Sequence, residues 1–235
     1  MKNKIMLPSI LSKDNWFYKE NEDKLKHLLG VPYISYSTSN SWFTYKEDMI
    51  KQKFAGIKLP DGIYALMGNY VGEAVENGYF SENNPNGFAG QENLDLNRYR
   101  KPNAEYEKIV IIERDGYFIV GFIDIFYVEN EIANLEDNKT GGKDKEKDYA
   151  SDDYIQTVLY GYYIEQTLKL IPKIGVNFIR REGSHVNPPL KISKEQFYIP
   201  NVYSKERVDK ALTKIDKAVI EISELYSVYL KFFAK

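Results

Sequence analysis

Between residues 108 and 141 the chain carries three apolar segments, each rich in β-branched and aromatic side chains. Two short polar breaks separate the segments, Asp115-Gly116 and Glu129-Asn130-Glu131. An Asp-Gly pair between two such segments is typical of a tight β-hairpin. The pattern therefore predicts a three-stranded antiparallel meander. Its second strand should be central in the sheet, because apolar residues lie on both of its faces.

Apolar residues at helical spacing surround this meander. In the strongest case they recur through residues 62–77 at positions that one helix face would share. Pro172 should end the helix expected near 152–170, and Ser151 or Asp152 is its expected N-cap. We expect helices at 16–30, 62–77, 152–170 and 204–230, and further strands at 174–181 and 195–199. The prediction is an α/β fold with a mixed central β-sheet flanked by helices.

Composition restricts the chemistry available to the chain. With no cysteine among 235 residues, thiolate zinc sites, iron-sulfur clusters and cysteine nucleophiles are excluded. His27 and His185 are the only histidines, so a metal site would consist mainly of carboxylates, which suit Mg²⁺ or Mn²⁺. A net charge of -2 provides no overall basic field, so any contact with nucleic acid must be local. The N-terminal apolar run is too short for a signal peptide, and no stretch of eighteen apolar residues occurs. We therefore expect a soluble, cytoplasmic protein with no membrane partner.

The second hairpin brings two aspartates together. If its loop is Asn130-Glu131, Glu129 pairs with Ile132, and Asp124 lies directly opposite Asp137 with Cβ atoms about 5 Å apart. Two carboxylates this close in an apolar sheet repel each other unless a cation lies between them, and a divalent metal would remove the conflict.

Lys139 shares the face of Asp137, two residues further along the strand. There it can contact a phosphate or an attacking water, which suits phosphodiester hydrolysis. Each residue also has a plainer interpretation: Asp124 as a structural residue at a strand end, and Lys139 as a side chain that extends to solvent. Glu136 should point to the opposite face and be solvated, unless a bulge makes it a ligand in place of Asp137.

The segments Gly121-Phe-Ile-Asp124 and Asp137-Asn-Lys139-Thr140-Gly141 resemble the PD-(D/E)XK nuclease superfamily, especially its RecB-like exonuclease branch. Gln156 and Tyr160 look like the QxxxY motif that engages substrate in that branch. Ser35-Tyr36-Ser37 resembles its N-terminal entry, and Met67-Gly68 through Glu76-Asn-Gly78 resembles its early helix. The resemblance runs from about residue 33 to 225.

The resemblance implies a restriction-endonuclease-like fold and a metal-dependent DNA nuclease, most simply an exonuclease, that uses Mg²⁺ or Mn²⁺ and no iron-sulfur cluster. Asp124, Asp137 and Lys139 would be catalytic, Gln156 and Tyr160 would bind substrate, and DNA would be the partner, together with a helicase or recombination protein. The metal ligands would be Asp124, Asp137, the backbone carbonyl of Asn138, and Glu73. Glu73 is the candidate because Gly72 stands where many relatives place a histidine, although a solvent-exposed Glu73 is the plainer interpretation.

The same resemblance sets the expected domain organisation and one alternative. We expect a single nuclease domain over 1–235. Its segments would be a helical extension (1–30), early helices (31–78), a loop (79–107), a catalytic sheet and helix (108–199) and a closing helix (204–230). The alternative is a catalytically degenerate module of the same fold that binds DNA or a partner protein without cutting.

Overall fold

The computed structural model describes residues 4–184 and 189–233. Its chain contacts divide into two compact units, each built from more than one stretch of the chain. We call them the N/C unit (Met1–Leu59, Ile109–Gly121 and Asp209–Lys235) and the central unit (Pro60–Lys108 and Phe122–Val208). The expectation of a single domain stays a prediction.

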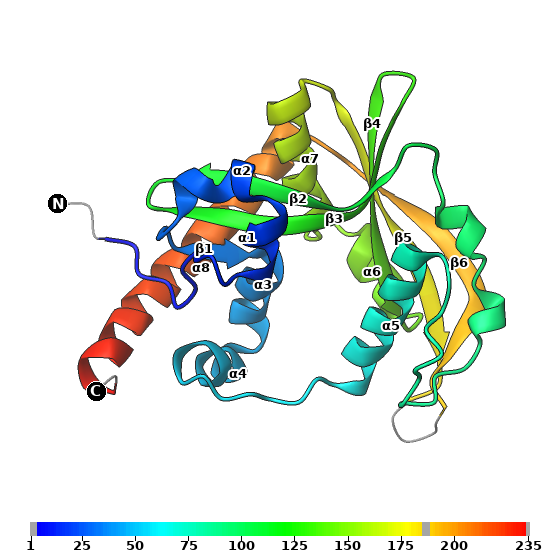
Figure 1. Cartoon of the computed structure of the whole chain (residues 1–235), viewed down its shortest axis with the longest axis horizontal. Helices are drawn as coiled ribbons and strands as arrows, with labels where there is room; N and C mark the ends of the chain where they lie inside the picture. The colour runs from blue at the N-terminus through cyan, green and yellow to red at the C-terminus, as the bar shows by residue number, and fades with distance from the viewer. Residues whose placement is uncertain (1–3, 185–188, 234–235) are drawn as a thin grey trace. The chain divides into compact units, whose positions relative to one another are not determined.

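A mixed sheet forms the middle of the central unit (Figure 1). The second half of β3 (Tyr117–Glu129) pairs antiparallel with β4 (Ile132–Gly141), and β4 pairs parallel with β5 (Pro172–Glu182). β5 in turn pairs antiparallel with β6 (Lys191–Asn201). The predicted α/β architecture, with a mixed sheet and flanking helices, is confirmed.

Helices cover both faces of this sheet. α5 (Ile63–Asn77) presents Met67, Val71 and Val75 to an apolar cluster that includes Ile125 and Ile179. α7 (Gln156–Leu168) packs against β4 and β5, and α6 (Lys145–Ala150) lies before it in the chain. Side chains alternate along a strand, and α7 reaches Asp137 whereas α5 contacts the face of Ile125. α5 and α7 therefore pack on opposite faces.

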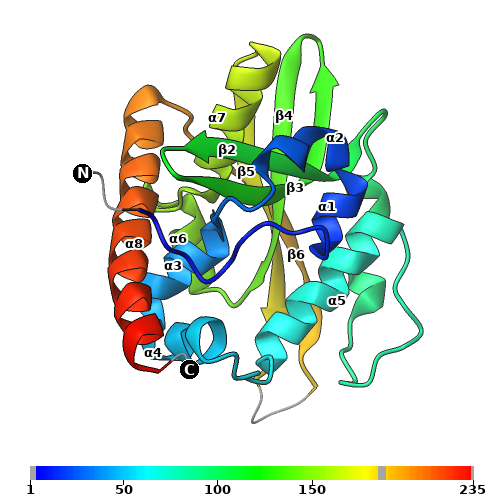
Figure 2. The same ribbon diagram turned by 60° about the vertical axis from the view of Figure 1, so that its left-hand side comes forward.

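Short elements form most of the N/C unit. β1 (Tyr33–Ser35) pairs parallel with the first half of β3, and β2 (Glu105–Arg114) precedes β3 across the Asp115-Gly116 turn. The helical elements are α1 (Trp16–Glu20), α2 (Glu22–Leu25), η1 (Lys26–Leu28), α3 (Tyr36–Thr44), α4 (Lys46–Met49) and the π-helical turn η2 (Ile50–Phe54). α8 (Lys205–Phe232) is one long continuous helix (Figure 2).

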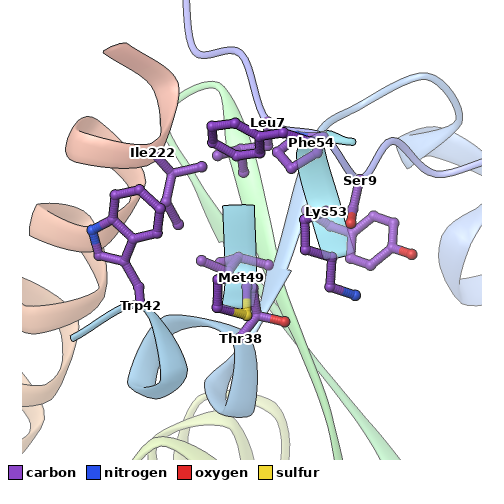
Figure 3. A pocket seen from close by; sticks show the side chains of 11 residues that line it. Leu7, Ser9, Thr38, Trp42, Met49, Lys53, Phe54 and Ile222 are labelled. Atoms are coloured by element: carbon purple, nitrogen blue, oxygen red, sulfur yellow. The ribbon is translucent and has the colours of Figure 1, made fainter. Parts of the chain in front are cut away.

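Trp42 is at the centre of the apolar packing in this unit. Its ring is 1% exposed, and its Nε1 donates a hydrogen bond to Glu221 on α8. Figure 3 shows Trp42, Met49 and Ile222 around a cavity of only about 10 Å³, which is room for a single water at most. The space around Trp42 itself is packed core, whereas a larger hollow of about 870 Å³ in the same unit lies beyond Leu7, between the N-terminal segment and α8.

Several elements differ from the sequence predictions. The helix expected at 16–30 is broken into α1, α2 and η1. β1 was not predicted, and α3 lies within the segment predicted to hold the early helices, 31–78, for which no bounds of its own were given. α7 begins at Gln156 with Ile155 as its N-cap, so the prediction of Ser151 or Asp152 as the cap was wrong. Part of the charged stretch before it forms α6. In the described part of the chain, no helix combines the length and apolar character needed to cross a membrane.

Candidate active site

The β3–β4 hairpin places Asp124 beside Asp137. Its two loop residues, Asn130 and Glu131, have φ angles of 49° and 64°, which is the left-handed conformation that tight two-residue hairpins require. The pairing runs from Glu129 opposite Ile132 to Ile125 opposite Glu136, as predicted. Beyond it, the backbone N–H of Asn138 donates to Oδ2 of Asp124 at 2.6 Å.

Asp137 is surrounded by hydrogen-bond donors. It is 1% exposed, and its Oδ2 lies 2.7 Å from Nζ of Lys139 and accepts a hydrogen bond of 2.6 Å from the hydroxyl of Tyr154. Its Oδ1 accepts from Nε2 of Gln156 at 3.0 Å. One cation and two neutral donors thus compensate a buried carboxylate that would otherwise be costly.

The charges at the site act strongly on one another. Burial, followed by the charge of Asp137, raises the pKa of Asp124 to about 8, well above its ordinary value. Burial alone would lower the pKa of Lys139, but the charges of Asp137 and Asp124 outweigh it and raise that pKa above its usual range. Lys139 is therefore a cation, and Asp124 is poised to ionise fully only when further positive charge arrives.

Gln156 and Tyr160 are neighbours at this site. Nε2 of Gln156 lies 3.1 Å from the hydroxyl of Tyr160, and the same nitrogen contacts Asp137. Tyr160 is 5% exposed, and burial, followed by the charge of Asp137, raises its pKa. The structure thus brings four of the predicted residues, Asp137, Lys139, Gln156 and Tyr160, into one network.

Tyr154 belongs to this network, although no sequence motif indicated it. The segment before α7 is held by the guanidinium of Arg207, which is 8% exposed and donates to the backbone carbonyls of Ser151, Asp152 and Tyr154. Arg207 lies 53 residues beyond Tyr154, so only the fold brings the two together. Arg207 thereby positions the tyrosine that hydrogen-bonds to Asp137.

Glu107 on β2 is a second residue that sequence reasoning missed. Its charge acts on Asp124. Its side chain is exposed to solvent on one side, and partial burial against the surrounding protein, followed by the charges of Glu76 and Asp137, raises its pKa. The alternation argument could have found it. In a regular two-residue hairpin over Asp115-Gly116, counting back along both strands places Glu107 opposite Asp124. The structure shows an irregular backbone at this point, because Glu107 has a φ of 51°.

The structure does not bring Glu73 into this group. Its side chain is exposed, as is that of Glu107, but the charges that act on Asp124 come from Asp137, Lys139 and Glu107 and not from Glu73. α5 approaches β4 closely at Gly68, where an added Cβ would lie 3.5 Å from Oγ1 of Thr140. Thr140 is on the opposite face of β4 from Asp137, so this approach does not carry Glu73 to the pair.

Glu136 corrects another expectation. It points to the opposite face from Asp137, as predicted, but it is buried at 8% exposure rather than solvated. Its two carboxylate oxygens accept hydrogen bonds from the Tyr127 hydroxyl at 2.9 Å and the Asn177 side-chain amide at 2.7 Å. The regular pairing of Ile125 with Glu136 shows no bulge that would turn it toward Asp124.

Oxygen atoms dominate the donor set that a metal would meet here. Asp124, Asp137 and Glu107 offer carboxylates, which fit Mg²⁺ or Mn²⁺ better than softer ions. Within residues 4–184 and 189–233 no three acidic or histidine side chains already lie close enough to hold an ion. His27 contacts Glu113 in the N/C unit, and His185 lies outside the described residues. The donor types fit such a metal, provided that Lys139 releases Asp137 when the ion binds.

Comparison with solved structures supports the fold. The structure of a "Putative exonuclease" from Eubacterium rectale aligns with a TM-score of 0.56 at 13% identity, covering 93% of this chain and 87% of that one. SSO0001 aligns with a TM-score of 0.38 at 16% identity, over 85% of this chain and 82% of that one, which is too low to support an argument. No family model matches the chain. No curated protein sequence matches it either.

Proposed function

We propose that the protein is a metal-dependent DNA nuclease of the PD-(D/E)XK superfamily, in its RecB-like exonuclease branch. The observation that carries this proposal is the network in which Asp137 contacts both Lys139 and Gln156 while Asp124 lies beside it on the next strand. These residues belong to the motifs on which the sequence resemblance rests. A fold shared with a protein described as a putative exonuclease supports the same conclusion.

Asp124 and Asp137 would hold Mg²⁺ or Mn²⁺, with Glu107 as the added carboxylate that the geometry favours over Glu73. The metal would supply an activated water and offset charge on the scissile phosphate. Lys139 would move from Asp137 to the phosphate or the water, where its raised pKa keeps it positively charged. Gln156 and Tyr160 would then orient the strand being cut, with Tyr154 and Arg207 keeping Asp137 in place.

Cleavage of end-labelled DNA tests this function. Single- and double-stranded substrates are incubated with the full chain in Mg²⁺, in Mn²⁺ and in EDTA, beside Asp124→Asn and Lys139→Ala. We expect cutting with either metal, none in EDTA, none by Asp124→Asn, and cleavage reduced at least about 100-fold in Lys139→Ala. Release of mononucleotides from an end would identify an exonuclease, whereas internal fragments would identify an endonuclease.

The competing interpretation is a degenerate module that binds DNA without cutting. It is favoured by one observation, that both oxygens of Asp137 already contact protein donors. Calorimetric titration with Mn²⁺ separates the two. An enzyme should bind Mn²⁺ in a manner that Asp124→Asn abolishes, whereas DNA binding with no Mn²⁺ binding and no cleavage would replace the nuclease proposal.

A further inference from the structure

A polar cavity of about 180 Å³ lies on the face of the central-unit sheet that is turned away from Asp137. Its deepest residues are Asn134, Glu136 and Asn177, which are exposed by only 8%, 8% and 4%. They come from β4 and β5, which pair in parallel. Each already has a partner within the protein: Asn177 donates to Glu136, and Asn134 donates to the backbone carbonyl of Ile132. What they offer a ligand is their remaining hydrogen-bonding capacity.

Glu136 is the only charged residue at the bottom of this cavity. Its hydrogen bonds come from the neutral groups of Tyr127 and Asn177, and no cation lies within ion-pair distance of it in the part of the chain that the structure describes. A carboxylate has about four acceptor sites, so each oxygen can still accept a further hydrogen bond. The cavity therefore offers two adjacent acceptors to a ligand that carries N–H donors.

Three cations line the same cavity nearer to solvent. They are Arg98, Lys101 and Lys173, and none of them forms an ion pair among residues 4–184 and 189–233. Arg98 donates to the backbone carbonyl of Gln196 at 2.7 Å, which leaves most of its five N–H donors for other contacts. An anion with more than one charge is the ligand group that three such cations suit.

We propose that this cavity binds a single nucleotide, with the N–H edge of its base on Glu136 and its phosphate on Arg98, Lys101 and Lys173. At 180 Å³ the space is smaller than pockets for drug-sized ligands, which run from about 300 Å³, so the base would enter and the phosphate would remain at the mouth. Carboxylates accept hydrogen bonds from base amino groups, and lysine and arginine contact phosphates.

Guanine suits this cavity best among the bases. Its ring N–H and its amino group lie side by side and can donate to both oxygens of one carboxylate. Thymine offers one N–H between two carbonyl oxygens, and these would face the Glu136 carboxylate unfavourably. Tyr127 and Tyr198 line the cavity too and give the base apolar ring surface to contact. The binding does not depend on the nuclease proposal, because the cavity is separate from the catalytic face.

Calorimetry of the full chain in EDTA tests the proposal, with dGMP, dTMP and inorganic phosphate as probes. We expect dGMP to bind at least about tenfold more tightly than dTMP or phosphate. Lys101→Ala should weaken dGMP binding, while Lys194→Ala, which removes an exposed charge on β6 outside the cavity, should not. The nucleotide could be free in solution or be the terminal residue of a DNA strand. A 5′-phosphorylated oligonucleotide ending in dG distinguishes these two sources, because tighter binding than dGMP would assign the nucleotide to a DNA end.

Glu136→Gln should remove the preference for dGMP over dTMP. If circular dichroism shows that this variant is unfolded, the comparison of probes with Lys101→Ala decides alone. Equal binding of dGMP, dTMP and phosphate would show a nonspecific anion site and overturn the proposal. The absence of dGMP binding would overturn it as well, and neither result would affect metal-dependent cleavage.

Discussion

At the residue scale, Asp124 and Asp137 differ in how their charges are compensated. Asp137 is held by Lys139, Tyr154 and Gln156, whereas Asp124 accepts a hydrogen bond from the backbone N–H of Asn138. Burial therefore affects the two unequally, and it raises the pKa of Asp124 to about 8. In the metal-free protein, ionising the buried Asp124 carboxyl beside Asp137 costs free energy, and a bound cation would offset that cost.

Asp124→Asn should therefore abolish cleavage and yet stabilise the metal-free protein at neutral and alkaline pH. The folded pKa of Asp124 lies above the unfolded value of about 4, so the wild type loses stability as the pH rises from about 4 through about 8. The asparagine variant has no such loss. We expect equal melting temperatures near pH 4 and a gain on the order of 1–3 kcal/mol for the variant near pH 8.

Thermal unfolding from pH 4 to pH 8.5 in EDTA measures this difference. A variant that melts far below the wild type at every pH would show that Asp124 is a structural residue. Cleavage by the variant at the wild-type rate would remove Asp124 from the active site.

Lys139→Ala should lose turnover and keep metal binding. A protonated lysine has no lone pair to give to a metal. In the metal-free protein Nζ of Lys139 lies 2.7 Å from Oδ2 of Asp137, where it would compete with a metal for that oxygen. We expect Mn²⁺ affinity by calorimetry to be equal to that of the wild type or higher, with cleavage reduced at least about 100-fold. Lys147→Ala, an exposed charge on α6, is the matched control and should leave both unchanged. Undiminished cleavage by Lys139→Ala would be incompatible with the mechanism.

At the scale of elements, the packing of α7 against β5 determines where Gln156 and Tyr160 lie. The helix packs closely on β5 at Gly161, where an added Cβ would lie 3.0 Å from Pro172, 3.0 Å from Tyr203 and 3.1 Å from Ile174. Pro172 and Ile174 belong to β5, and Tyr203 belongs to the segment after β6. Because three side chains surround this position, moving one of them aside would not make room for the added Cβ. Gly161 thus permits the close approach of α7 to β5.

Gly161→Ala should destabilise the protein by about 1–3 kcal/mol and weaken cleavage, because α7 must shift away from β5. Gly72→Ala on α5 is its matched control, since an added Cβ there meets nothing within 4 Å. In a helix interior that change should stabilise by up to about 1 kcal/mol. Urea unfolding of both variants provides the comparison. Destabilisation by Gly72→Ala would show that α5 packs as closely as α7.

The β3–β4 hairpin could be predicted from sequence because residues close together in the chain determine its loop and its register. A two-residue loop and a period of two determine which residues of the two strands face each other, and Asp124 and Asp137 follow from that count. The same count over Asp115-Gly116 would have indicated Glu107. The first sixty residues were less predictable because their short elements depend on tertiary packing, for example of Trp42 against α8.

Long-range contacts account for the other differences. Glu136 was expected to be solvated, but its partner Asn177 comes from β5, 41 residues away, and no local pattern indicates it. The late start of α7 follows from Arg207, which engages the carbonyls of the preceding segment. In both cases a distant polar group changes the environment of a residue whose own strand or helix was predicted correctly.

At the scale of the whole molecule, charge limits how DNA can be bound. The net charge of -2 provides no long-range attraction, so affinity must come from a few local phosphate contacts. Arg180 and Arg181 are already engaged within the protein, because Arg180 pairs with Glu195 and Arg181 lies 3.8 Å from the ring centre of Tyr64. The proposed nuclease would then bind DNA weakly by itself, and we propose that a helicase or recombination protein delivers the strand.

The distribution of tryptophan allows the cooperativity of the two units to be measured. Trp16 and Trp42 are the only tryptophans, and both belong to the N/C unit. The proposed metal ligands Asp124, Asp137 and Glu107 all belong to the central unit. Strands β2 and β3 and helix α8 each contribute residues to both units. Because these elements are continuous across the division, we expect the chain to unfold as one cooperative domain.

Mg²⁺ should then raise the unfolding midpoint seen by tryptophan fluorescence as much as the midpoint seen by far-ultraviolet circular dichroism. At one hundred times its dissociation constant a ligand stabilises by about 2.7 kcal/mol, which for a chain of this size is a shift of roughly 5–10 °C. Asp124→Asn should show no shift by either probe, since it lacks a metal ligand. If Mg²⁺ moves the circular dichroism transition but leaves the tryptophan transition in place, the units unfold separately and the single-domain prediction fails. Because the metal acts only in the central unit and the fluorescence reports only from the N/C unit, agreement between the probes can arise only through coupling between the units.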